Sequence, residues 1–121
     1  MRKTILAVLF FLPGCALAAE GVPLFSTADP MKAVLTAPIL QAYRDKGKDD
    51  RLYLEGHWSS TRGDTVERLG VKIRARGNYR RKVCDYPPLL LNFKKKEVEG
   101  TLLAGQDKLK MVSPCEKGDK Y

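Results

Sequence analysis

The residues best suited to binding a charged ligand are concentrated in one stretch, from residue 71 to residue 82. Five basic side chains in this stretch could contact an anion: Lys72, Arg74, Arg76, Arg80 and Arg81. Arginine presents a planar fork of N–H donors that matches phosphate and carboxylate groups, and lysine presents a compact positive charge. The stretch therefore predicts an anion-binding surface. The same pattern also fits a solvated sheet face on which basic side chains protect an edge from aggregation.

The local pattern predicts a strand followed by a turn. Between residues 71 and 76, basic residues alternate with the apolar residues Val71, Ile73 and Ala75. This period of two is typical of a strand with one buried and one exposed face. Gly77 and Asn78 both tolerate positive φ, so we expect them to form the structural turn that ends the strand.

Motifs for catalysis or for metal binding are missing from the sequence. It has no glycine-rich phosphate loop and no Ser/His/Asp set with supporting motifs. His57 is the single histidine, and its alternation with Glu55 on a polar strand face favours a surface role. Asp49 and Asp50 are two adjacent acids in a loop, which is a weak indication of calcium binding. We therefore predict no catalytic residue, metal site or cofactor for this chain alone.

The N-terminus has the layout of a secretory signal peptide. Arg2 and Lys3 precede an apolar run over residues 5–12, and Ala16-Leu17-Ala18 supplies small residues for cleavage. We expect residues 1–18 to be removed, which leaves 19–121 as an exported, periplasmic or secreted chain. The alternative is a lipoprotein anchored through Cys15, because Leu12-Pro13-Gly14-Cys15 resembles a lipidation motif. The apolar run is too short for a transmembrane helix, and no later segment could span a bilayer.

The mature chain is expected to be basic. The full sequence of 121 residues has a formal charge of +8, and loss of Arg2 and Lys3 would lower it to +6. A basic exported protein can meet anionic lipid, lipopolysaccharide, cell-wall polymer or an acidic protein partner. Nucleic acid is not expected, because the aromatic residues near the basic stretch are too few for a stacking platform.

The two cysteines that remain after cleavage, Cys84 and Cys115, predict one disulfide bond. They lie 31 residues apart, and an oxidising compartment favours their pairing. Closing a loop of this size contributes about 3–4 kcal/mol in the chain-entropy model. A metal site would need more ligands than one histidine and two separated cysteines provide.

The predicted fold is mainly β (α+β), an antiparallel sheet of about five strands with one short helix. The strands are expected at residues 31–36, 51–58, 65–76, 89–93 and 108–112. The helix is expected to begin at Ala37-Pro38, with Pro38 in its first turn, and Gly47 is expected to end it. Residues 59–64 are expected to form a hairpin-type loop. Residues 89–93 are apolar at most positions, which predicts a central strand covered on both faces. A single β-rich domain and the N-terminal part of a longer domain both fit this pattern.

An ordered set of short motifs between Val71 and Met111 resembles the first lobe of the CotH (spore coat protein H) kinase-like family. The set is Val71–Asn78, a Pro-containing connector, Leu89–Lys96, then Gly105 and Lys108–Met111. It is also similar to a group of uncharacterised exported bacterial proteins. The resemblance implies an atypical kinase fold that uses nucleotide and metal, with its catalytic acids in a second lobe downstream. Arg74, Arg76 and Asn78 match the first-lobe motif, and the chain alone would be inactive as a kinase.

Overall fold

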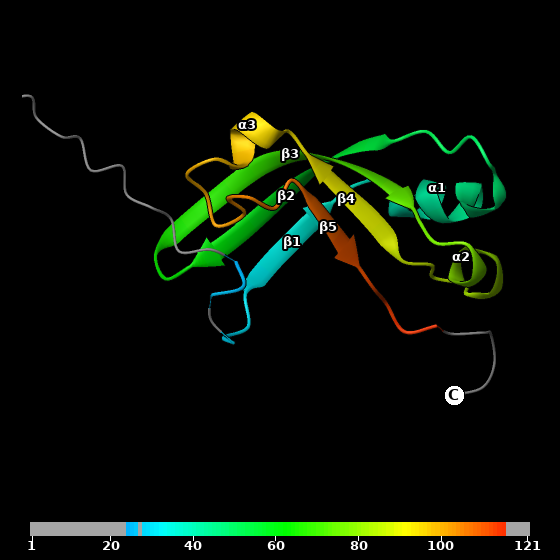
Figure 1. Cartoon of the computed structure of the whole chain (residues 1–121), viewed down its shortest axis with the longest axis horizontal. Helices are drawn as coiled ribbons and strands as arrows, with labels where there is room; N and C mark the ends of the chain where they lie inside the picture. The colour runs from blue at the N-terminus through cyan, green and yellow to red at the C-terminus, as the bar shows by residue number, and fades with distance from the viewer. Residues whose placement is uncertain (1–23, 27, 116–121) are drawn as a thin grey trace, which may run out of the picture.

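A computed structural model describes residues 24–26 and 28–115, which form one antiparallel sheet with short helices at its margins (Figure 1). The strands follow one another in chain order across the sheet, so each pairs with its neighbour in sequence. They are β1 (Lys32–Thr36), β2 (Leu54–Arg62), β3 (Thr65–Ala75), β4 (Leu89–Phe93) and β5 (Lys108–Met111). The predicted fold class is confirmed. The predicted signal peptide and Cys15 lie outside the described residues.

The longest pairing joins β2 to β3 and corrects two predicted boundaries. Its register runs from Leu54 opposite Ile73 to Arg62 opposite Thr65, so the turn is only Gly63 and Asp64. The predicted loop over 59–64 is wrong for its first four residues, because residues 59–61 pair with both β1 and β3 and Arg62 pairs with β3. The predicted start of this strand at residue 51 is also wrong, since the ladder begins only at Leu54.

The core lies against one side of the sheet. Val71, Ile73 and Ala75 point into it as their alternation predicts, and all three are buried. They are joined by buried residues from the neighbouring strands and from the segments that cover them: Ala42, Trp58, Leu89, Leu91, Phe93, Val98 and Leu103. Trp58 and Phe93 meet edge to face, with ring centroids 5.8 Å apart. The apolar half of each alternating strand therefore builds the core, as burial of apolar surface requires.

A close approach near the end of β1 requires a glycine in β2. A Cβ atom added to Gly56 would lie 2.6 Å from the Ala37 Cβ and 2.8 Å from the Thr36 carbonyl oxygen. Real Cβ atoms do not approach backbone atoms so closely, so only glycine fits without moving the chain. Gly56 therefore lets β1 pass directly into the helix that follows.

Three short helices and one 3₁₀ turn flank the sheet. They are α1 (Ile39–Arg44), η1 (Asp45–Gly47), α2 (Tyr79–Val83) and α3 (Lys95–Val98). The predicted short helix is confirmed, although it starts at Ile39 and Pro38 is its N-cap, whereas α2 and α3 are additional. Gly77 has the positive φ of +90° expected of a turn, but Asn78 has right-handed helical geometry and is the N-cap residue directly before α2. The predicted turn therefore ends β3 and starts a helix.

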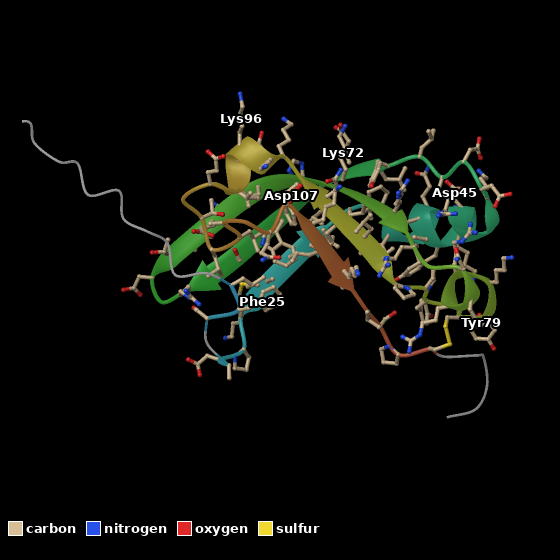
Figure 2. All side chains as sticks on the ribbon, viewed as in Figure 1. Phe25, Asp45, Lys72, Tyr79, Lys96 and Asp107 are labelled. Atoms are coloured by element: carbon tan, nitrogen blue, oxygen red, sulfur yellow. A yellow bond between two sulfur atoms is a disulfide. The ribbon has the colours of Figure 1, made fainter. Side chains whose placement is uncertain are left out.

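We use the term helical end for α1, η1, α2 and the loop to residue 51, which gather at one end of the sheet (Figure 1). Cys84 directly follows α2 and forms the predicted disulfide with Cys115, beyond β5; its Cα atoms are 4.9 Å apart. Figure 2 shows this bond in yellow near Tyr79. The disulfide therefore ties the last described residues to the helical end.

The prediction that β4 is covered on both faces is only half right. Leu89, Leu91 and Phe93 are buried, whereas Leu90 and Asn92 on the other face are partly exposed. Leu90 lies between Arg74 and Lys110, and Asn92 lies between Lys72 and Lys108. These charged neighbours must stay hydrated, so an apolar layer cannot pack over this face.

Candidate anion-binding face

Cross-strand register places most of the strand cations on one face. Partners directly opposite each other share a face, so the face opposite the core can be followed from β1 to β5. We call it the outer sheet face. Its cations are Lys32, Arg68, Lys72, Arg74, Lys108 and Lys110. Among the strand residues that the structure describes, Glu55 is the one acid on this face.

The structure separates the five predicted anion-binding residues into two regions. Lys72 and Arg74 lie on the outer sheet face, and in Figure 2 Lys72 projects from the top of the sheet. Arg76 lies just beyond β3, where its backbone N–H donates to the Pro88 carbonyl oxygen at 2.8 Å. Arg80 and Arg81 lie in α2, at the helical end. The run of charge in the sequence is therefore not one continuous surface.

Arg81 is a buried structural residue, with only 7% of its surface exposed. Its Nε donates to the Gly77 carbonyl oxygen at 3.0 Å, and one terminal nitrogen donates to the carbonyl oxygens of Lys46 and Lys48 at 3.0 and 2.7 Å. Its other terminal nitrogen is 3.8 Å from the Asp49 carboxylate. These contacts use the guanidinium to hold the loop after α1 against α2, so we leave Arg81 out of the proposed ligand surface.

Arg51 holds the same loop from its other end. It donates to the carbonyl oxygen of Ala75 at 2.9 Å and to that of Lys48 at 2.8 Å. Burial lowers the pKa of Arg51 below its ordinary value, and the nearby positive charges of Arg81 and Arg74 lower it further. Lys46 adds a third cationic donor, with its ammonium 2.6 Å from the Cys84 carbonyl oxygen. Backbone carbonyl oxygens at the helical end therefore accept hydrogen bonds from a group of cations, in place of a ligand.

The cations of the outer sheet face are held much more loosely. Lys72 lies 3.7 Å from the Glu55 carboxylate, and both side chains are at least half exposed. Arg74 stacks over the Tyr53 ring, with its guanidinium carbon 4.4 Å from the ring centroid. Exposed pairs of this kind contribute little to stability, so these side chains can turn to an anion at small cost.

A hollow of about 370 Å³ lies in the middle of this face. Gly70 has no side chain, so the surface between Arg68 and Lys72 drops to the backbone. The hollow is lined by residues of β2, β3 and β4 and of the segment that follows β4: Glu55, Gly56, His57, Gly70, Val71, Lys72, Asn92, Phe93 and Lys94. Lys94 also donates to Glu97 of α3 at 3.0 Å. A concave site with several polar groups therefore lies within this basic surface.

Sequence reasoning missed Lys32, Arg68, Lys108 and Lys110. The alternation of Lys108 and Lys110 with Leu109 and Met111 was a usable signal, since alternate residues share a face. Whether Lys108 and Lys110 lie on the same face as Lys72 depends on how the strands pair in register, and the local sequence pattern does not contain that information. The hollow was also missed, because Gly70 in the sequence does not indicate which residues of the neighbouring strands surround it.

Comparison of the chain with family models, with curated proteins and with solved structures found no match. The resemblance to the CotH kinase-like family stays a prediction. Over residues 24–26 and 28–115, none of the helices combines the length and the apolar character needed to cross a bilayer. Within the same residues, no three potential metal-ligating side chains of histidine, cysteine, aspartate or glutamate come together.

Proposed function

We propose that this protein is a non-catalytic binding module whose outer sheet face binds an anionic surface or polymer. The single observation that carries the proposal is the charge of that face, where six cations lie with Glu55 on the described strands. A solvated sheet that only needed solubility would be better served by interspersed charges of both signs.

The geometry of a sheet lets these cations act together on an extended anion. Neighbouring strands are about 4.8 Å apart, and successive residues on one face of a strand are about 7 Å apart. Both spacings are shorter than the screening length of about 8 Å at physiological ionic strength. A surface or polymer with repeated negative charges would therefore meet the summed field of several side chains.

The test compares two triple variants that lose the same charge. One removes Arg68, Lys108 and Lys110 from the outer sheet face, each replaced by alanine. The matched control replaces the exposed Arg44, Arg80 and Lys82 of the helical end. Binding is measured by co-sedimentation with vesicles of phosphatidylglycerol and phosphatidylcholine in equal parts, at low and at high salt.

The outer-face triple variant should bind on the order of 100-fold more weakly, since each lysine or arginine near an anionic surface contributes about 1 kcal/mol. The control triple should lose much less, and high salt should weaken binding of the unaltered protein. Equal losses in the two triples would show that only net charge matters. Either that result or salt-independent binding would overturn the proposal.

The alternative, an inactive first lobe of a CotH-like kinase, rests on the motif resemblance alone. It carries over no catalytic residue onto this chain. It predicts neither ATP hydrolysis nor phosphotransfer by the purified chain.

A further inference from the structure

The hollow over Gly70 has the features of a defined subsite within the outer sheet face. Gly70 lies directly opposite His57 in the β2–β3 ladder, so the floor is strand backbone rather than side chains. A Cβ atom added to Gly70 would meet only the Glu97 carboxylate, at 3.9 Å. The space is therefore open enough to receive a ligand group, and its volume falls within the range of small-molecule sites.

The polar groups around the hollow come from three strands and converge on one space. His57 comes from β2 and Lys72 from β3, while Asn92 and Lys94 lie at the end of β4 and just after it. Two ammonium groups thus face this space, with the Glu55 carboxylate beside Lys72 and the Glu97 carboxylate beside Lys94. Asn92 and His57 add hydrogen-bonding groups beside these charges.

We propose that this hollow binds the phosphodiester group of a hydroxyl-bearing ligand, an inference that rests on the proposed function. A phosphodiester carries one negative charge, which the ammonium groups of Lys72 and Lys94 can attract in place of their exposed glutamate partners. Lysine binds phosphate oxygens as a point charge from many directions, whereas a carboxylate is matched best by the planar fork of arginine. The Asn92 amide and the His57 ring supply hydrogen bonds for neighbouring hydroxyl groups.

The two lysines are available at small cost. Lys72 is 3.7 Å from Glu55, and Lys94 is 3.0 Å from Glu97, with both lysine side chains at least half exposed. Exposed ion pairs contribute about 0–1 kcal/mol, so a phosphate oxygen can replace either partner. The two glutamates hold the ammonium groups near the hollow and compete with the ligand for them.

The same phosphodiester chemistry occurs in an anionic lipid headgroup and in a soluble glycerol-phosphate chain. The experiment therefore uses two probes, phosphatidylglycerol vesicles and a soluble glycerol-phosphate oligomer. The central variants are Gly70→Ala and Gly70→Val, which fill the hollow in steps without changing the charge. Gly70 is not among the glycines with positive φ, so valine fits its extended backbone.

Gly70→Val should weaken binding at least 10-fold, and Gly70→Ala should weaken it less. Glu55→Gln should strengthen binding several-fold, because it removes a competitor and a repulsive charge. Lys72→Ala should weaken binding more than Lys108→Ala, a matched loss of charge on the same face outside the hollow. If Gly70→Val does not fold, as judged by near-UV circular dichroism, the comparison of Lys72→Ala with Lys108→Ala tests the phosphodiester site instead.

The outcomes separate this inference from the proposed function. Loss of binding to both probes in Gly70→Val supports a phosphodiester site for either source, and loss on vesicles alone assigns it to a lipid headgroup. Unchanged binding of folded Gly70→Val to both probes overturns the inference. If the triple variant at Arg68, Lys108 and Lys110 still binds weakly in that case, the proposed function stands without this subsite.

Discussion

The helical end and the outer sheet face are both rich in lysine and arginine, but they use these residues in opposite ways. At the helical end, Arg51 and Arg81 donate to backbone carbonyl oxygens and are partly or fully buried. On the outer sheet face, Lys72 and Arg74 have one loose contact each and reach solvent. The difference lies in the acceptors nearby. Carbonyl oxygens of the loops and of the last residue of β3 accept from arginine, whereas carbonyl oxygens along the strands pair within the sheet.

Removal of the Cys84–Cys115 disulfide should produce the largest loss of stability. Cys84→Ala with Cys115→Ala should lower the free energy of unfolding by about 3–4 kcal/mol, because the unfolded chain regains the freedom of the 31-residue loop. Urea unfolding followed by Trp58 fluorescence would measure the loss. Vesicle binding by the folded double variant should be unchanged if the two regions act independently. Weaker binding in that variant would show that the disulfide also positions the outer sheet face.

Two adjacent arginines, Arg80 and Arg81, test most directly whether buried and exposed cations have different roles. Arg81→Ala should cost about 1–3 kcal/mol of stability, because it removes three partly buried hydrogen bonds and leaves the Gly77 and Lys46 carbonyl oxygens without this donor. Arg80→Ala should change stability by less than about 0.5 kcal/mol, since the Arg80 side chain is exposed. Thermal unfolding of the two variants would measure the difference. Equal effects would contradict the structural role assigned to Arg81.

The smallest expected effect is a pH dependence that arises at the helical end. Burial raises the pKa of Tyr43 above its ordinary value of 10.0, and Tyr86 raises it further. The folded state therefore keeps this proton at a pH where the unfolded state loses it, so stability should fall as pH rises above 10 towards the folded pKa. Tyr43→Phe should remove this contribution. Urea unfolding of both proteins between neutral pH and pH above 10 would test it, and identical pH slopes would refute it.

Patterns along the sequence predicted most of the fold. The alternation around Val71 and Ile73 predicted which side of β3 is buried, and the cysteine pair predicted the disulfide. The sequence-based predictions were wrong where pairing with neighbouring strands, and not the residue type, decides the secondary structure. The polar residues Ser59 and Ser60 continue β2 because β1 and β3 pair with them on either side. Their intrinsic strand propensity alone would not predict this pairing.

The candidate site was predicted less completely than the fold. Lys72 and Arg74 were identified correctly as outward-facing strand residues, but Arg81, from the same run of charge, is buried. Only the folded chain brings three backbone carbonyls around its guanidinium, and two of them lie more than 30 residues away in sequence. A charge run alone therefore could not distinguish an exposed cation from a buried structural one.

The sequence by itself determined the β-rich class, the alternation that separates core from solvent and the pairing of two cysteines, since these depend on local period and on composition. Tertiary structure decided which cations are free, how Lys32, Lys72 and Lys108 come to share one face, and that Gly70 opens a hollow among them. These features depend on strand register and on contacts between distant segments. Such contacts form only when the whole sheet assembles, because no single strand can specify what lies beside it.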